Sequence, residues 1–231
     1  HLSILNDQLI SDGLMRQCHA ALQERHPDWP LVFAGQLGIG MDGTPGPGTV
    51  DVSHRDLVRQ TRAAGKRLVD LGFGRIVIMT FHGSPFHNAA LWEVAEELRS
   101  QGIRVATPMN VITRRIMAPD PEEFAAVYQA VPDPADAARL RARAHEDFHS
   151  GFGETSLALH FVPETVVDHQ SVPPAPALPI LPAWGALARA AEGLGKTVLA
   201  QELRFVGMGM AWFGLRPFPG YTCEPALASA E

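Results

Sequence analysis

A histidine, two glycines and a carboxylate lie close together in HSGFGETS, the segment at residues 149–156. Glu154 comes five residues after His149 and precedes an apolar run, SLALHF, that predicts a helix. An imidazole and a carboxylate at this spacing can bind a divalent metal or move a proton. A carboxylate at a helix start can also cap the helix or interact favourably with its dipole. The spacing alone leaves both interpretations open.

His82 is a second candidate, because it directly follows a β-rich apolar run, RIVIMTF, at residues 75–81. Such a run is typical of a central strand that is covered on both faces. In open α/β sheets, ligands bind beyond the carboxyl ends of the parallel strands. The turn at residues 83–85 would hold the imidazole at that edge, although a histidine at such a point is more often only hydrogen-bonded in a strand-end loop. Asp7, near the start of an expected helix, is the third candidate.

The elements that must position these residues follow from apolar periodicity. The spacing predicts helices over residues 7–24, from Ser53 to about Gly72, around 91–98, over 134–146 and over 184–194. Strands are expected over residues 31–34, 75–81 and 103–107. Helices that alternate with buried strands imply parallel pairing. We therefore expect an α/β fold, a three-layer α/β/α sandwich with a mainly parallel central sheet.

The composition narrows the class of protein. A chain of 231 residues can bury one substantial core, so we expect a single domain over residues 1–231. A net charge of -6 and a pI near 5.9 disfavour binding to nucleic acid or to an anionic membrane. No apolar run reaches the roughly 18 residues of a membrane span. The two cysteines, Cys18 and Cys223, suggest neither a disulfide framework nor a thiolate zinc site, so a cytoplasmic location is expected.

HSGFGETS resembles the H-[AS]-G-x-x-E-T-S segment of the creatininase family and matches it at every fixed position. His82-Gly83 after a buried strand is similar to that family's N-G-H-G-G-N. Three further segments agree in order: HLSILND at 1–7 with H-L-P-L-G-T-D, PGTV at 47–50 with P-G-T-[IV], and GYTCEPALASAE at 220–231 with G-x-x-G-D-P-x-x-A-T-A-E. The resemblance thus extends over nearly the whole chain.

The resemblance implies an α/β/α enzyme in which two adjacent divalent metals activate a shared water. By analogy, Asp7 would bridge the metals, while His82 and Glu154 would each bind one of them. His149 would be the general acid that protonates the departing amide nitrogen. These ligand types are compatible with Zn, Mn or Fe. The family also implies a small-molecule amide substrate and a homo-oligomer, often a hexamer.

The chain departs from the family pattern in the loop after His82. Ser84 and Pro85 replace Gly-Asn, and Phe86 and His87 are inserted before Asn88. In creatininase a glutamate two residues after the histidine binds metal, and a serine cannot replace that anionic ligand. Glu154 would then supply the carboxylate. Asn88 or His87 would occupy the place of the missing Asn, unless His87 is a solvated loop residue.

Two other departures lie at the ends of the sequence. The family's remaining two ligands come from an E-x-H segment just before H-L-P-L, which would lie upstream of His1, so we expect a domain clipped at both ends. Cys223-Glu224 stands where Gly-Asp is usual, a change that we interpret as structural.

These observations favour a metal-dependent amidohydrolase that cleaves a non-peptide or cyclic C–N amide bond. One alternative is a catalytically impaired creatininase-like subunit that serves binding or assembly, which the altered loop and the absent ligands would explain. Another is a metal-dependent peptidase or deformylase of the same family. The residues that select the substrate are expected at 109–133 and 171–183.

Overall fold

The computed structural model describes residues 1–44, 48–117 and 124–230. Pro47 of the PGTV motif, part of the 109–133 region and Glu231 lie outside the described residues. The chain divides into two compact units, each of which is described by itself. The N-terminal unit is Ser3–Thr113, and the C-terminal unit consists of His1–Leu2 and Arg114–Glu231. The expectation of a single domain stays a prediction.

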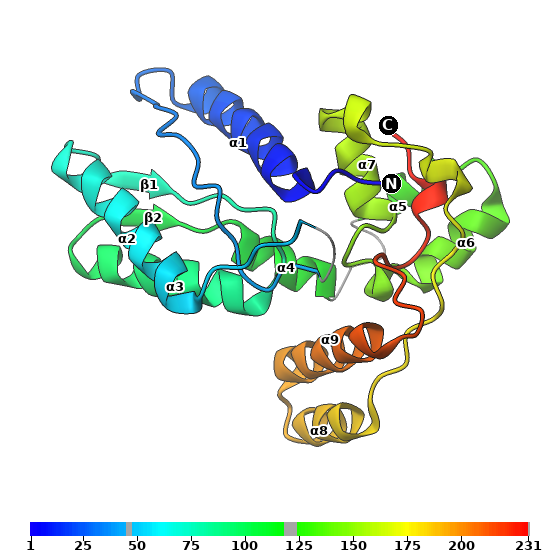
Figure 1. Ribbon diagram of the computed structural model, residues 1–231. Helices are drawn as coiled ribbons and strands as arrows, with labels where there is room; N and C mark the ends of the chain where they lie inside the picture. The colour runs from blue at the N-terminus through cyan, green and yellow to red at the C-terminus, as the bar shows by residue number, and fades with distance from the viewer. Residues whose placement is uncertain (45–47, 118–123, 231) are drawn as a thin grey trace. The chain divides into compact units, whose positions relative to one another are not determined.

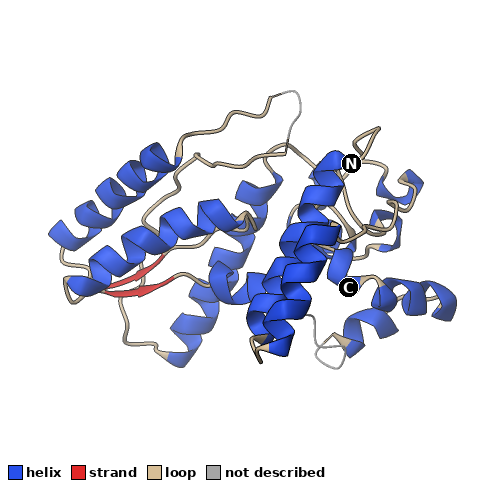
Figure 2. Ribbon diagram, turned by 90° about the horizontal axis from the view of Figure 1, so that it is seen from below, coloured by secondary structure: helices blue, strands red, loops and turns tan. Residues whose placement is uncertain are grey.

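The N-terminal unit carries the only two strands among the described residues, and helices make up most of its remaining regular structure (Figures 1 and 2). Its elements are α1 (Asn6–Arg25), α2 (His54–Asp70), β1 (Arg75–Val77), α3 (Pro85–Ser100), β2 (Arg104–Ala106) and the start of α4 (Met109–Met117).

The core of this unit lies between the strands and two helices. β1 and β2 pair in parallel, as predicted, with Ile76 opposite Val105. Both of these residues are buried while their neighbours in each strand are exposed, so only one face of the sheet is covered. Helices α2 and α3 cover that face together, since one cluster contains residues of both helices and both strands: Leu57, Val58, Ile76, Ala90, Leu91, Val94, Ala95, Leu98 and Val105.

The sheet is smaller than the sequence predicts. The run at 75–81 is a strand only over Arg75–Val77, and the run at 103–107 only over Arg104–Ala106. Residues 31–34 form no strand, and the side chains of Val32 and Phe33 are exposed. Apolar composition favours burial, but a strand also needs a hydrogen-bonded neighbour. The described residues are therefore mostly helical with a two-stranded parallel sheet, and a complete three-layer sandwich is not seen in them.

The predicted helix starts are mostly confirmed. Ser53 caps α2, because its hydroxyl accepts a hydrogen bond from the Asp56 N–H. Gly65 in α2 permits close packing on α3, since a side chain there would begin 2.9 Å from Cδ1 of Leu98. Helix α1 has the predicted position but buries only Asn6 and Ile10.

The C-terminal unit is built from short helices and one helical hairpin. Its elements are α5 (Ala125–Gln129), α6 (Pro134–Ala142), η1 (Ala144–Glu146), α7 (Phe152–Phe161), η2 (Pro163–Thr165), η3 (His169–Ser171), α8 (Pro182–Gly193), α9 (Thr197–Gly214) and η4 (Pro225–Leu227). Helices α8 and α9 pack closely at Gly207, where a side chain would begin 2.7 Å from Cβ of Trp184. None of the helices in the described residues has the length and apolar character needed to cross a membrane.

Replacing Leu57 by Ala should destabilise the N-terminal unit by about 2–5 kcal/mol, because the side chain is fully buried and its loss leaves a cavity. Urea unfolding followed by circular dichroism measures the change. Leu71→Ala is the matched control, since Leu71 follows the same helix and is exposed, and it should change stability by less than about 0.5 kcal/mol. Equal effects of the two substitutions would contradict the described core.

Candidate active site

Asp7 and His82 meet in the N-terminal unit. Asp7 lies in the first turn of α1, and His82 lies between β1 and α3. Nδ1 of His82 is 2.8 Å from Oδ2 of Asp7, and Nε2 is 2.8 Å from the carbonyl oxygen of Met41. Two candidates that are 75 residues apart in the sequence are thus in direct contact.

The surroundings of His82 stabilise a positive charge. Both of its partners are hydrogen-bond acceptors, so both contacts are made only when the imidazole carries two protons. Burial lowers the pKa of His82, but the Asp7 carboxylate and the Met41 carbonyl outweigh that effect, and the pKa is raised overall. Neutral imidazole and carboxylate are both ligands of zinc-like ions. The donor types of the Asp7–His82 pair are therefore those that a divalent metal would need, a carboxylate and an imidazole.

Side chains of the altered loop hold the backbone around His82. Ser84 is the N-cap of α3, accepts from the His87 N–H at 3.3 Å and donates to Oδ2 of Asp42 at 2.5 Å. The side-chain amide of Asn88 donates to the carbonyl oxygens of His82 and Ser84, at 2.8 and 2.9 Å. The remodelled residues are thus used to fix the turn that carries the histidine.

His87 is buried, so the expectation that it could be a solvated loop residue is wrong. Its side chain is 5% exposed, and its ring lies edge-on to that of His82 with 5.0 Å between ring centroids. Burial, followed by the neighbouring charge of His82, lowers the pKa of His87 to about 4. The imidazole is therefore neutral at physiological pH.

His149 and Glu154 lie in the C-terminal unit, at the start of α7. Oε2 of Glu154 accepts a hydrogen bond from the Ser150 N–H at 2.8 Å. This hydrogen bond is the structural use of a carboxylate at a helix start, which the sequence left open as an alternative to metal binding. The ring of His149 packs against that of Trp212, with centroids 5.1 Å apart. The two predicted roles, metal ligand for Glu154 and general acid for His149, stay predictions.

The backbone of His149 is held by a buried threonine from the C-terminal motif. Oγ1 of Thr222 accepts hydrogen bonds from the N–H groups of Phe148 and His149, at 3.2 and 3.1 Å. The Thr222 N–H donates to the His149 carbonyl at 2.8 Å, and Thr222 itself is fully buried. The motifs at 149–156 and 220–231 are therefore joined by direct contacts.

Asp147 is a further residue of this site that the sequence analysis missed. Its Oδ2 accepts from the Gly153 N–H at 2.8 Å, which satisfies a donor in the first turn of α7. A side chain at Gly151 would begin 2.0 Å from Oδ1 of Asp147 and 2.8 Å from the Thr222 carbonyl oxygen, so this position requires glycine. The sequence feature that could have identified Asp147 is a carboxylate two residues before His149, next to a turn that contains glycine.

Burial raises the pKa of Asp147 to about 7, and the nearby Glu154 carboxylate adds to the effect, although hydrogen bonds from Gly153 and Phe152 oppose it. The helix start thus holds two carboxylates that influence one another.

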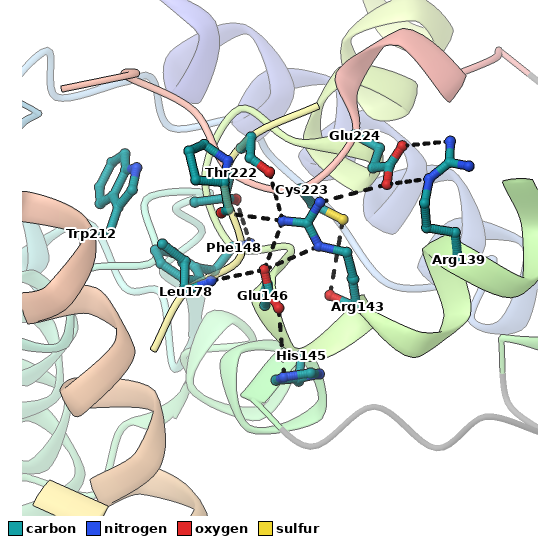
Figure 3. Close-up of polar contacts among 12 residues, drawn as sticks. Arg139, Arg143, His145, Glu146, Phe148, Leu178, Trp212, Thr222, Cys223 and Glu224 are labelled. Carbon is teal, nitrogen blue, oxygen red and sulfur yellow. Dashed lines mark hydrogen bonds and ion pairs between the residues drawn. The ribbon is translucent and has the colours of Figure 1, made fainter. Parts of the chain in front are cut away.

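Behind this site, Glu224 is a buried carboxylate with two arginine partners (Figure 3). Arg139 binds it through two hydrogen bonds of 2.7 and 2.9 Å, and Arg143 lies 3.6 Å from Oε1. Arg143 also donates to Glu146 and to the Ala175 carbonyl. These contacts support the structural interpretation of the Cys223-Glu224 change.

The candidate ligands do not complete a metal cage in the described residues of either unit. No group of three or more His, Cys, Asp or Glu side chains there is arranged to hold a metal ion. Asp7 and His82 lie in one unit and Glu154 in the other. Their assignment to one metal site therefore remains a proposal.

Thr222→Val should destabilise the C-terminal unit by roughly 1–3 kcal/mol, because the Phe148 and His149 N–H groups lose their acceptor. Thr222→Ser is the matched control, since it keeps the hydroxyl, and it should lose less. Denaturant unfolding measures both variants. If Val and Ser substitutions were equally destabilising, the hydroxyl would not be what holds His149.

Asp147→Asn should remove a dependence of stability on pH. The folded pKa of about 7 lies above the usual value of 3.8, so between these values the folded state keeps a proton that the unfolded state has lost. Wild-type stability therefore falls as pH rises from 4 to 7. Relative to wild type, the variant should gain roughly 2–4 kcal/mol over this range, as measured by unfolding at a series of pH values. Parallel pH curves would contradict the raised pKa.

Comparison with known proteins completes the assignment. The family model of creatininase, described as creatinine amidohydrolase, matches residues 1–231. No curated protein and no solved structure matches the chain. Because the family match extends over both units, the chain belongs to the creatininase family.

Proposed function

We propose that this protein is a metal-dependent amidohydrolase that cleaves a non-peptide or cyclic C–N amide bond in a small molecule. The observation that carries the proposal is the contact of 2.8 Å between Asp7 and His82, two residues expected to bind metal. Family membership supports the reaction class. Asp7, His82 and Glu154 are the proposed ligands of two divalent ions, Zn, Mn or Fe.

When bound, such ions lower the pKa of a coordinated water and polarise the substrate carbonyl. The chain's own contribution is to hold the ligands ready. Asp7 would hold the ions through its carboxylate, and His82 through its imidazole. For this, His82 would have to release the proton that it shares with Asp7, while the Met41 carbonyl accepts from the other ring nitrogen. This second contact orients the imidazole.

His149 is the proposed general acid, which donates its ring proton to the departing nitrogen. An amine anion is too poor a leaving group at neutral pH, so protonation must accompany bond cleavage. Thr222 fixes the backbone of His149 on both its N–H and its carbonyl, and Trp212 packs against its ring. Such support limits the directions in which the ring can present its proton.

The finer expectations about the fold and assembly belong to the same proposal. We propose that the chain folds as a single three-layer α/β/α sandwich and that it acts in the cytoplasm as a homo-oligomer, for which a hexamer is the family's usual form. An association surface is supported by apolar side chains that are exposed on and beside α8 and α9: Leu187, Leu194, Val198, Leu199, Met210 and Phe213.

The same surface favours a second candidate function, a creatininase-like subunit that has lost catalysis and serves binding or assembly. The two functions differ in whether turnover depends on His149. A peptidase or deformylase of the same family would instead keep that dependence but differ in its preferred substrate.

Dialysis against a chelator should abolish hydrolysis of small cyclic amides, creatinine included, and added Zn²⁺ or Mn²⁺ should restore it. His149→Gln should lower kcat by about 10²–10⁴-fold, because the departing nitrogen loses its acid. Chromatography of the products measures both effects, and formylated and unmodified peptides tested in parallel identify the substrate class.

His145→Gln is the control for this experiment, since His145 lies close in sequence and its side chain is exposed. It should leave kcat unchanged. Absence of turnover on every substrate, with metal present, would favour the assembly function. An unchanged kcat in His149→Gln would remove His149 from the mechanism.

A further inference from the structure

His1 belongs to the family-like segment HLSILND but has no role in the proposed reaction. It lies in the C-terminal unit, whereas Asp7 of the same segment lies in the N-terminal unit. Its Nε2 is 3.0 Å from Oγ1 of Thr155, a fully buried residue that is 154 positions later in the chain. The first residue is therefore attached to helix α7 (Figure 1).

Two further contacts fix the orientation of His1. Its carbonyl oxygen accepts a hydrogen bond from the Val167 N–H at 2.9 Å. Its ring lies edge-on to the ring of Tyr221, with 6.0 Å between the ring centroids. The Tyr221 hydroxyl in turn donates to the Pro173 carbonyl at 3.0 Å. The imidazole is thus held by its own backbone and between two side chains.

Both contacts of this imidazole ring reach residues that adjoin the candidate catalytic segment. Thr155 directly follows Glu154 in α7, and Tyr221 directly precedes Thr222, whose hydroxyl accepts from the His149 N–H. Successive residues of an α-helix are related by a constant rotation about its axis. Fixing the side chain of Thr155 therefore also fixes the direction in which Glu154 leaves the helix. The ring joins the segment that carries Glu154 to the segment that holds His149.

The turn between His149 and α7 needs such support, because its backbone is strained. Ser150 has a φ of 46°, in the left-handed region that is costly for a residue other than glycine. Its N–H is held by Oε2 of Glu154 at 2.8 Å. A residue keeps a strained conformation only where its surroundings impose it. If the hold on α7 were lost, Ser150 could relax, and His149 and Glu154 would be displaced together.

We propose that His1 is a positioning residue, whose imidazole acts through the Thr155 hydroxyl to keep the turn at 149–154 in the conformation that presents His149 and Glu154. A neutral imidazole is sufficient, since either partner can donate the hydrogen bond. The inference rests on the proposed function and deepens it, because it names a residue that serves the reaction through the turn.

Amide hydrogen exchange of the full chain in chelator, followed by NMR, tests the geometry without turnover. His1→Phe keeps a ring against Tyr221 but removes the ring nitrogens, so the Ser150 N–H should exchange about two- to tenfold faster. Thr155→Val should have the same effect, and the double variant should exchange no faster than either single one, because both remove one contact. His160→Phe is the matched control, since His160 is exposed in the last turn of α7, and it should exchange as the wild type does.

Unchanged exchange in His1→Phe, or additive effects in the double variant, would overturn the proposal.

Kinetics with metal present test the consequence for the reaction. His1→Phe and Thr155→Val should each lower kcat about two- to tenfold and leave KM within about twofold, because groups that act in the transition state are misplaced while substrate binding is kept. Thr155→Ser keeps the hydroxyl and should recover most of the kcat. The measurements are made at a temperature where circular dichroism shows every variant to be folded, so that a loss of stability alone cannot lower kcat.

The outcomes distinguish this inference from the proposed function. If the wild type hydrolyses amides and His1→Phe keeps its kcat, His1 is not a positioning residue and the proposed function stands. If the wild type hydrolyses no amide but the exchange of Ser150 responds as expected, the proposed function fails, whereas the control of the turn by His1 is supported.

Discussion

The buried carboxylate of Glu224 is the constraint on which the C-terminal unit depends. A charge removed from water is tolerated only when it is paired and hydrogen-bonded. Glu224 meets this requirement through Arg139 and Arg143, so α6 and the residue that follows it must face the C-terminal motif (Figure 3). Arg143 extends the network to Glu146 and to the extended segment at Ala175. One ionic centre thus joins three stretches of chain, and the apolar cluster around Leu140 and Cys223 packs beside it.

The candidate catalytic segment is built on this network. Thr222 is two residues from Glu224, so fixing the carboxylate also fixes the hydroxyl that holds the backbone of His149. Asp147 closes the turn from the other side by binding the first turn of α7. This compact turn requires a glycine at 151, because no side chain fits there between Asp147 and Thr222. Packing therefore explains the glycine of the family motif H-S-G.

Polar contacts have a similar part in the N-terminal unit. Helix α1 buries only two residues, so its packing alone gives it little stability. Asp7 contacts His82, and Ser11 accepts from the Phe81 N–H at 2.7 Å. The segment that follows β1 is thereby attached to the start of α1. The pair of residues that is proposed to bind metal thus also attaches the helix, which links the proposed chemistry to local stability.

Much of the fold and part of the candidate site could be predicted from the sequence, because they depend on local sequence patterns. The family motifs and the helix at 54–70 with its Ser53 cap depend on neighbours within a few residues or on short-range periodicity. The parallel pairing of two apolar runs could be predicted from the alternation of helices with buried strands. Strand length could not be predicted in this way, since the run at 31–34 is apolar but lacks a hydrogen-bonded neighbour among the described residues.

Only the tertiary structure decided the environment of the individual polar groups. These environments include the burial of His87, the two acceptors around His82 and the contact of Thr222 with His149. Each depends on residues that are far apart in the chain or on different elements. Sequence spacing does not indicate such contacts, because hydrogen bonds and burial depend on distances in space. The sequence by itself determined the family and the chemical types available, whereas the tertiary structure decided which of those groups are paired, charged or left without a partner.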